Sequence, residues 1–319
     1  MMRNLLLAAA NLVPLFLVVQ GAFADGPDVT MTWVEKYVTY RQRESGELEL
    51  TDVHFLAEIS FDGERDFDTI RASLFKDGSE VPLATFAGSD KRAFTNGYYY
   101  TRKTRSFDSV EDLEAVHPSD AEFTWHVSGP AGDYELPPIR IGGPEGSLQV
   151  PPPSPIHLLQ NGAPLRGPLT IDSGADLTIA WNPFDIGATL EGTEWDDLIF
   201  VLISDCTGEV VYTAGAPGTD VDFARFDDES SLVPAGTLQP GRDYVIFISQ
   251  VNYVDHNASN GIEQLAANSF ATELAIRTVQ ESSDSQTVCE GTQRPAQYLW
   301  TRKTRGEAMQ TWPTVADYW

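Results

Sequence analysis

The amino-acid sequence predicts an all-β protein with two β-sandwich domains in tandem after a cleaved signal peptide. Three observations lead to this prediction. Short segments alternate apolar and polar residues with a period of two, which is typical of half-buried strands. A proline-rich stretch divides the chain near its middle, and the first residues form an apolar run behind one positive charge.

The first residues have the three parts of a secretory signal peptide. Arg3 supplies the charge, the run from Leu5 to Val19 is apolar, and Ala22-Phe23-Ala24 offers small residues to a signal peptidase. The apolar run is short for a membrane span and contains a proline. We therefore expect cleavage before Asp25, no membrane span, and a secreted, extracellular or periplasmic protein. A buried N-terminal helix or a retained anchor is the alternative.

Acidic residues dominate the charge of the chain. It has 21 Lys and Arg residues against 47 Asp and Glu residues, which gives a formal net charge of -26 at pH 7. Such a field repels nucleic acid and anionic lipid, so neither is expected as a partner. Solubility is one interpretation, and chelation of structural Ca²⁺ by a carboxylate-rich loop is the other. The weak candidates for that calcium site are Asp220, Asp222, Asp227 and Asp228, and no other cofactor is expected.

The two cysteines, Cys206 and Cys289, both lie after the predicted cleavage site. In an oxidising compartment an even pair is most simply one disulfide, which would tie the C-terminal tail to the body of the protein. Two buried free thiols are the alternative. Two sulfurs without nearby histidines do not complete a tetrahedral metal site.

The clearest domain boundary is the run Pro151-Pro152-Pro153-Ser154-Pro155, which favours a stiff, extended spacer. We divide the chain into a signal peptide (1–24), an N-terminal β-sandwich domain with one short helix (25–146), a Pro/Gly-rich hinge (147–155), a second sandwich (156–280) and an aromatic and basic tail (281–319).

Period-two alternation marks the strands of the first domain. They are expected at Val53–Ile59, Phe67–Leu74, Tyr98–Tyr100, Phe123–Val127 and Ile139–Ile141. The one helix is expected at Phe107–Val116, because Asp108 or Ser109 can cap its start, acidic residues follow, and Pro118 comes after its end.

The second domain has a cleaner strand pattern. Its strands are expected at Leu177–Trp181, Leu198–Ile203, Val210–Tyr212, Tyr244–Val251 and Phe270–Ile276. Asp205 to Gly208 reads as a hairpin turn. Gly187–Asp197 is predicted to be an acidic loop and Asn252–Asn268 a long loop, with a helical turn near Ile262–Ala267.

The segment from Leu238 to Ile248 resembles the start of the sixth strand of fibronectin type III modules, an immunoglobulin-like sandwich class. The resemblance implies a buried Leu238 and a Tyr244 whose hydroxyl bonds to nearby backbone. Leu177–Trp181 resembles the second strand of that family with its core tryptophan. The similarity covers residues 154–279 and departs from the family at the acidic loop and the long last loop. Such modules are mostly spacers and interaction surfaces, although the fold alone fixes no function.

No catalytic motif stands out. The chain lacks a G-x-S-x-G turn, a phosphate-binding glycine loop and a zinc-type histidine pair, and its five histidines are scattered. A glycosidase needs two carboxylates at a set separation, and loop residues such as Glu194 could supply them. An enzyme is therefore the less favoured class.

One pentapeptide occurs twice. Thr101–Arg105 recurs without change as Thr301–Arg305, and each copy follows an aromatic pair, Tyr98/Tyr100 or Tyr298/Trp300. Lys and Arg could protect an edge strand from pairing with another chain. The functional alternative is a cationic and aromatic patch for an acidic ligand or for the acidic surface of the protein itself.

The leading hypothesis is a secreted, non-catalytic binding or adhesion protein that recognises a glycan or an extracellular protein. The alternatives are a glycan-active hydrolase or lyase, and a structural subunit that self-associates through its tail. The candidate ligand-binding residues are Tyr98, Tyr100, Arg102, Arg105, Trp195, Tyr253, Trp300, Arg302 and Trp312. Asn257 starts an N-x-S sequence and is a weak glycosylation candidate.

Overall fold

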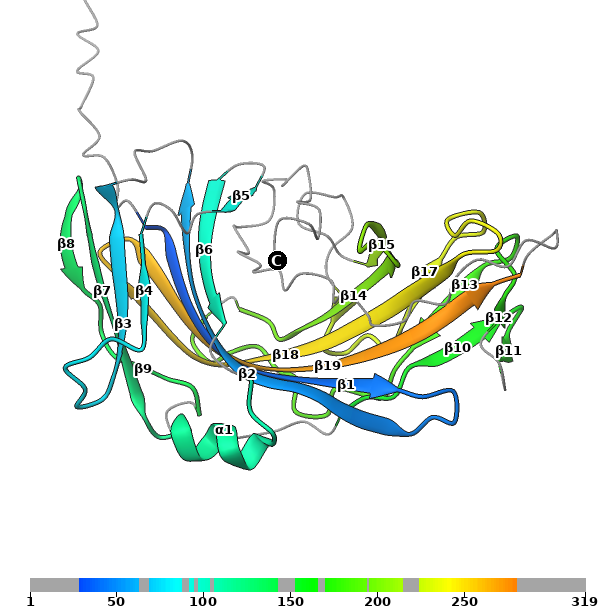
Figure 1. The fold of residues 1–319 in the computed structure, drawn as a ribbon, viewed down its shortest axis with the longest axis horizontal. Coiled ribbons are helices and arrows are strands. Elements are labelled where there is room, and N and C mark those ends of the chain that lie inside the picture. Colours follow the sequence, from blue (N-terminus) through cyan, green and yellow to red (C-terminus); the bar gives the residue numbers. More distant parts are fainter. Residues whose placement is uncertain are drawn as a thin grey trace, which may run out of the picture.

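The structure is a computed structural model that describes residues 29–62, 69–87, 92–94, 97–103, 106–142, 153–165, 170–193, 195–214 and 224–279. Within these residues the chain is mostly β and has a single short helix, in agreement with the sequence (Figure 1). The strands form three sheets, and one of them extends along the whole of the described fold.

The large sheet has ten strands in the order β15-β14-β18-β19-β1-β2-β6-β5, with β12 beside β19 and β16 beside β14. Its strands are β1 (Met31–Gln42), β2 (Leu48–Asp62), β5 (Arg92–Phe94), β6 (Gly97–Lys103), β12 (Thr170–Ile171), β14 (Leu198–Asp205), β15 (Val210–Ala214), β16 (Ala224–Arg225), β18 (Asp243–Ser259) and β19 (Ile262–Thr278). β18 and β19 have 17 residues each and curve from one end of the fold to the other, which gives the sheet a concave and a convex face (Figure 1).

The first strand lies in the middle of the large sheet. β1 pairs with β19 in parallel, from Met31 opposite Glu263 to Gln42 opposite Leu274, and with β2 on its other side. The structure therefore differs from two separate sandwiches in tandem, because the two halves of the chain share one sheet. Local alternation predicts a strand but not its distant neighbour, so the sequence alone gave no sign of this pairing. The predicted hinge, 147–155, lies mostly outside the described residues.

Two smaller sheets pack on one face of the large sheet. The strands of the five-stranded sheet are β3 (Arg71–Lys76), β4 (Ala84–Phe86), β7 (Glu122–Gly129), β8 (Gly132–Glu135) and β9 (Ile139–Arg140), and those of the four-stranded sheet are β10 (His157–Gln160), β11 (Ala163–Pro164), β13 (Leu177–Ala180) and β17 (Ser230–Val233). On β19, Ile262 and Phe270 pack in the core beside the first, and Ile276 packs in the core beside the second. These even-numbered residues share one side of the strand. We call that convex side the outer face and the concave side the inner face.

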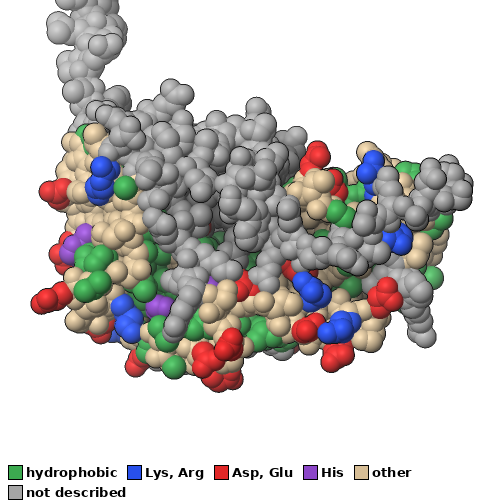
Figure 2. Space-filling view, in the orientation of Figure 1, with side chains coloured by type: hydrophobic (Ala, Val, Ile, Leu, Met, Phe, Trp, Pro, Cys, Tyr) green, Lys and Arg blue, Asp and Glu red, His purple; other side chains and the backbone are tan. Residues whose placement is uncertain are grey.

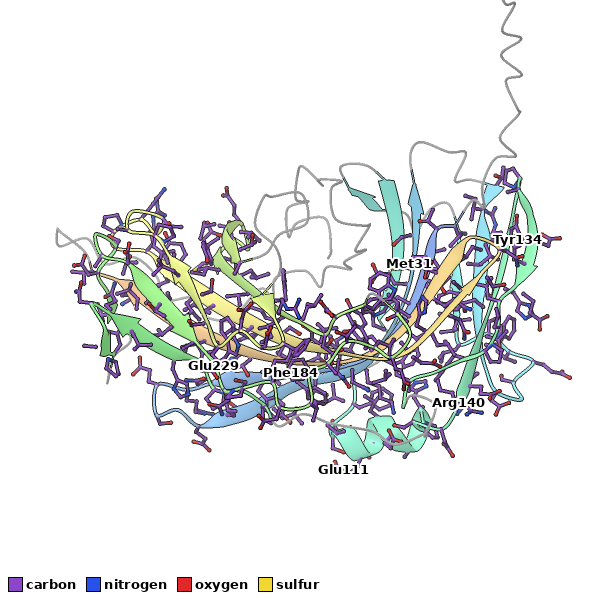
Figure 3. All side chains as sticks on the ribbon, turned by 180° about the vertical axis from the view of Figure 1, so that it is seen from behind. Met31, Glu111, Tyr134, Arg140, Phe184 and Glu229 are labelled. Atoms are coloured by element: carbon purple, nitrogen blue, oxygen red, sulfur yellow. The ribbon has the colours of Figure 1, made fainter. Side chains whose placement is uncertain are left out.

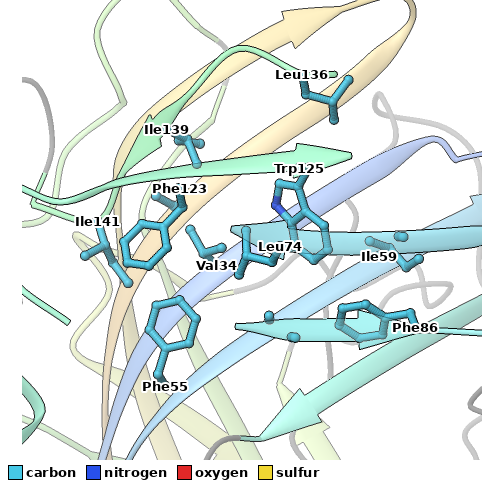
Figure 4. Packing of buried hydrophobic residues seen from close by; sticks show 14 of the residues in the cluster. Val34, Phe55, Ile59, Leu74, Phe86, Phe123, Trp125, Leu136, Ile139 and Ile141 are labelled. Carbon is cyan, nitrogen blue, oxygen red and sulfur yellow. The ribbon is translucent and has the colours of Figure 1, made fainter. Parts of the chain in front are cut away.

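The first core lies between β1, β2 and the five-stranded sheet (Figure 4). On β7, Trp125 and Phe123 are fully buried. The ring of Trp125 lies 5.6 Å from that of Phe86, and the ring of Phe123 lies 5.1 Å from that of Phe55. Burial of each such side chain contributes roughly 2–3 kcal/mol relative to exposure.

The second core contains the two features that the fibronectin type III resemblance implies. Trp181 is 3% exposed, and its indole N–H donates to the carbonyl oxygen of Asp228 at 2.8 Å. The Tyr244 hydroxyl accepts a hydrogen bond from the backbone N–H of Gln239 at 2.9 Å, and Leu238 is buried. Both expectations, the core tryptophan and the tyrosine bonded to nearby backbone, are confirmed.

The helix forms where the sequence predicts it. α1 spans Val110–Val116, and the Ser109 side chain caps it by accepting a hydrogen bond from the backbone N–H of Asp112 at 3.0 Å. From the outer face of β1, the Lys36 ammonium donates to the carboxylate of Glu114 on α1 and to Ser119 Oγ, the latter at 3.0 Å. A buried ion pair thus joins the helix to the large sheet.

The segment expected to be a long loop is a continuous hairpin, so the loop and its helical turn were wrong. β18 and β19 meet at Asn260-Gly261, whose φ angles of 54° and 76° fit a two-residue turn of type I′. Polar side chains hold this hairpin against β9 and the residues beside it. Asp255 Oδ2 accepts from the N–H of Arg140 at 2.8 Å, and Asn268 Nδ2 donates to the Ile141 carbonyl at 3.1 Å.

Replacing Gly261 with alanine is expected to lower the free energy of unfolding by about 1 kcal/mol, because an L side chain resists positive φ. Chemical denaturation measures the change. The matched variant Asn260→Gly keeps both residues in accessible conformations and should change the free energy much less. Equal effects of the two substitutions would show that the turn conformation does not limit stability.

Charge on the visible surface is dispersed. Figure 2 shows acidic side chains at both ends and along the convex margin of the fold, with basic side chains between them. No helix in the described ranges is long and apolar enough to cross a membrane. The gathering of buried charge on the inner face is therefore the more informative feature.

Candidate binding face

The inner face carries aromatic side chains and carboxylates in alternation. On β1 it receives the odd-numbered residues, including Met31, Trp33 and Glu35, because even-numbered Val34 packs in the outer core. Figure 3 shows Met31 on the concave side, whereas Glu111 on α1 lies beyond the convex side. The sequence Met-Thr-Trp-Val-Glu-Lys-Tyr-Val therefore divides into two different faces.

Glu35 lies at the centre of the inner face and is 5% exposed. Burial raises the pKa of this carboxyl from 4.5 to about 7, although hydrogen bonds from Ser269 and Trp33 oppose the shift. The indole N–H of Trp33 donates to Oε2 at 3.3 Å, and the Ser269 hydroxyl donates to Oε1. Both carboxyl oxygens of Glu35 thus have donors, and the group changes charge near neutral pH.

Two further glutamates lie on the same face with even less exposure. Glu58 on β2 is opposite Trp33, and Glu273 on β19 is opposite Phe247 on β18, so each shares the face of its partner. Both are 1% exposed. β1 lies on the other side of β19 from β18. There the register partner of Glu273 is Arg41, an exposed residue near the end of β1. Burial of several carboxylates costs free energy unless cations or hydrogen-bond donors meet them.

A histidine and an aspartate extend the polar row along β2. His54 Nδ1 lies 3.0 Å from Asp52 Oδ2, and the Ser106 hydroxyl donates to Asp52 Oδ1 at 2.8 Å. The His54 imidazole stacks on the Tyr37 ring at 5.2 Å. His54 is fully buried, and these contacts give it structural partners within the sheet.

Aromatic side chains close one end of the inner face. Tyr253 meets Trp33 at 5.4 Å and Trp195 at 5.7 Å between ring centroids, both edge to face. Trp195 belongs to the acidic loop 187–197, and His256 lies beside it at 6.4 Å. His256 in turn contacts the Glu263 carboxylate at 2.5 Å. The three rings form an apolar wall next to the carboxylates.

Asp197 anchors the acidic loop to this wall. Its carboxylate accepts hydrogen bonds from Asn252 Nδ2 at 2.7 Å, from the N–H of Tyr253 at 2.7 Å and from the N–H of Ala188 at 3.0 Å. Burial raises the pKa of Asp197 to about 6, against the lowering effect of these bonds. This acidic residue therefore holds the loop in place, and its oxygens are already engaged.

The combination defines what the face can bind. Carboxylates attract a cation, and aromatic rings present an electron-rich face to Lys or Arg. A guanidinium can donate to a carboxylate and stack on a ring at once. The inner face is suited to a polypeptide segment that carries basic and aromatic side chains.

Among the side chains that the structure describes, two of the residues predicted to contact a ligand, Trp195 and Tyr253, lie together. Trp195 is half-buried, and Tyr253 is 4% exposed, so Tyr253 offers no open ring to a sugar. Tyr98, Tyr100 and Arg102 lie on β6, which pairs with β2, so that Arg102 is opposite Ala57 and Tyr100 is opposite Ile59. The remaining candidates lie outside the described residues, and they are Arg105, Trp300, Arg302 and Trp312.

The structure describes two of the four predicted calcium ligands. Asp220 and Asp222 lie outside the described residues, as does Glu194. Asp227 is 3.2 Å from Arg225 Nε, and Asp228 accepts from the N–H of Arg225 at 2.7 Å. Within the described ranges no group of three or more His, Cys, Asp or Glu side chains could hold a metal ion.

The structure describes one cysteine of the predicted disulfide and the predicted glycosylation residue. Cys206 lies in the exposed turn after β14, with Sγ 3.7 Å from the Asp243 carbonyl oxygen, and Cys289 lies outside the described residues. Their disulfide stays a prediction. Asn257 lies on β18 rather than in a loop, and its Nδ2 donates to the Pro138 carbonyl at 3.1 Å. A glycan at that nitrogen would have to displace this bond.

The three buried glutamates, Glu35, Glu58 and Glu273, were not predicted as site residues. Sequence reasoning sought paired carboxylates in loops, whereas these residues stand inside strands among apolar neighbours. One signal was present. An acidic residue on the same strand parity as a tryptophan, as in Trp33-Val34-Glu35, marks a face that is neither purely core nor purely solvated.

Comparisons with known proteins concern the fold alone. No protein-family model matches the chain, and no curated protein matches it. The FN1–FN3 domains of chicken CNTN1 are similar at 9% identity and a TM-score of 0.23, covering 77% of this chain and 63% of that one. The yeast delta-COP-I mu-homology domain, complexed with a Dsl1 WxWxV peptide, matches at 9% identity and a TM-score of 0.21, covering 80% of this chain and 100% of the other. The described residues by themselves define the protein as a mostly β chain.

A third solved structure gives a weaker likeness. The BSP domain of a biofilm associated protein matches at 7% identity and a TM-score of 0.14, covering 82% of this chain and 68% of that one.

Proposed function

We propose that the protein is an exported, non-catalytic binding protein whose ligand is an extracellular protein. The observation that carries the proposal is the inner face of the large sheet. There Glu35 and Glu58 lie beside Trp33, and Glu273 lies further along the same face, opposite Phe247; the three glutamates are each 5% exposed or less. A basic and aromatic polypeptide segment complements this surface.

Protein is favoured over glycan because of the carboxylates. The Trp33 and Tyr253 rings are 3% and 4% exposed, so any ligand, sugar or peptide, must first displace what covers them. Both rings meet other rings edge to face. Buried glutamates are better matched by Arg or Lys side chains, which form charge-assisted hydrogen bonds.

A glycan-active hydrolase is a second candidate because of Glu35. A carboxyl group with a pKa of about 7 can donate a proton at neutral pH. Such an enzyme also needs a second carboxylate on the other side of a sugar cleft. Turnover of a polysaccharide that disappears in Glu35→Gln would replace the binding proposal with this one.

Binding should depend on the glutamates of the inner face. Glu58→Gln and Glu273→Gln are each expected to weaken binding of a synthetic peptide rich in Arg and Tyr by at least about tenfold, since each removes a buried partner charge. Fluorescence polarisation at low salt measures the affinity. Glu111→Gln is the matched control, because Glu111 is exposed on α1, beyond the convex side of the sheet.

Equal losses in all three variants would indicate a general charge effect and would contradict a specific face. Thermal unfolding of each variant separates lost binding from lost structure.

A further inference from the structure

We infer that the inner face is covered by a segment of the chain's own C-terminal tail, residues 298–305. The inference rests on the proposed function, because it names the basic and aromatic segment that the face holds. That segment reads Tyr-Leu-Trp-Thr-Arg-Lys-Thr-Arg.

The low exposure of the inner face supports a cover over it. The apolar cluster of the inner face consists of side chains of the large sheet, joined by Leu190 and Trp195 from the acidic loop. Trp195 lies over the Tyr253 end. The described elements place no second sheet or helix over the concave side of β1, β2 and β19 (Figure 1). Glu58 and Glu273 are nevertheless 1% exposed, which is the burial expected of a covered face.

The positive charge of residues 298–305 complements the carboxylates of the inner face. Among the stretches outside the described residues, 298–305 is an eight-residue segment that contains three cations and no acidic residue. Tyr298 and Trp300 precede these cations, so aromatic rings can join the wall at Tyr253 while Arg302 and Lys303 meet carboxylates. The rings of the segment would then pack on the rings of the face, and its cations would pair with the carboxylates.

The repeated pentapeptide supports the same placement. The first three residues of the first copy, Thr101 to Lys103, lie on β6 and pair with β2. Thr101 is opposite Glu58 itself. The sequence Thr-Arg-Lys therefore already occurs in a strand next to one of the buried glutamates.

The tail is long enough to return. Eighteen residues, 280–297, separate the end of the described chain from the segment, and extended they span up to about 60 Å. The path back along β19 from Thr278 to Ala267, the neighbour of Glu35, is about 36 Å. Because the tail is tethered, its effective concentration at the face is of the order of millimolar.

The experiment uses the full chain and the variant R302E/K303E/R305E. Hydrogen–deuterium exchange is expected to accelerate at least about tenfold in residues 31–39 and 263–273 of the variant, because the cover leaves. Residues 122–129 of β7, which belong to the outer core, serve as the internal control and should not change. The synthetic peptide Tyr298–Arg305 should bind the variant at least about tenfold more tightly than the intact chain, since the intact tail competes.

Three results would overturn the inference in different ways. Unchanged exchange with equal, glutamate-dependent peptide binding to both chains would mean that the face holds basic segments but not this tail, and the proposed function would survive. Unchanged exchange with no peptide binding to either chain would remove both. Protection that rises with protein concentration, together with a dimer mass by light scattering, would assign the cover to the tail of a second copy.

Discussion

Replacing Glu114 with alanine is expected to lower the free energy of unfolding by about 3 kcal/mol, because it leaves the buried Lys36 ammonium without its counter-charge. The Lys36 side chain is 2% exposed and that of Glu114 is 35% exposed, so the estimate lies at the low end for a buried pair. Burial lowers the pKa of Lys36, and the Glu114 carboxylate opposes that shift. Denaturant unfolding followed by circular dichroism measures the change.

Two further variants separate charge from packing. Lys36→Met combined with Glu114→Ala removes both charges, and the double variant should be more stable than Glu114→Ala alone, because no unpaired ammonium remains. Glu111→Ala alters an exposed acidic residue on the same helix and should change the free energy by less than about 0.5 kcal/mol. A double variant as unstable as Glu114→Ala would show that lost helix packing, not the buried charge, sets the cost.

Glu35→Gln is expected to remove a pH dependence of stability worth about 3 kcal/mol between pH 4 and pH 8. Burial raises the pKa of Glu35 from 4.5 to about 7 in the folded protein. Below pH 4.5 the carboxyl is neutral in both states and costs nothing extra. As pH rises toward 7 the unfolded chain releases the proton first, so the wild type loses stability through this window. Glutamine does not titrate, so the variant does not lose stability in this pH range.

The measurement is the difference in unfolding free energy between the two proteins across that range. The variant should gain on the wild type as pH rises from about 4.5 to 7, and the difference should then level off. Asp197 also has a raised pKa, but it is present in both proteins and cancels. Exposed Glu49→Gln should give no such trend. Parallel curves for Glu35→Gln and the wild type would mean that Glu35 is ionised in the folded protein at low pH.

Local chemistry in the sequence predicted local structure well. Ser109 has a side chain that can accept from the third residue after it, and it caps α1. Leu238 and Tyr244 form the expected corner at the start of β18. The hairpin from Asn252 to Asn268 was missed because its residues are polar. Their partners, such as the backbone of Arg140 and Ile141, come from another part of the chain, and no local pattern contains them.

The inner face was missed for a related physical reason. Glu35 and Glu58 become neighbours on one face only when β1 pairs with β2, and Glu273 comes onto the same face, opposite Arg41, only through the pairing of β1 with β19. Each strand alone shows one acidic residue among apolar ones. A site that forms across strands far apart in the sequence depends on register, which the sequence of one strand does not specify.

The parallel pairing of β1 and β19 also determines how the protein would respond to mechanical force. Tension applied at residue 29 and residue 279 pulls the two neighbouring strands in opposite directions along their length, since β1 starts and β19 ends at opposite ends of their shared ladder. The hydrogen bonds of that ladder are then loaded in shear, all together, rather than opened one after another like a zipper. The joint between the two halves of the chain should therefore be the last part of the described fold to yield under tension.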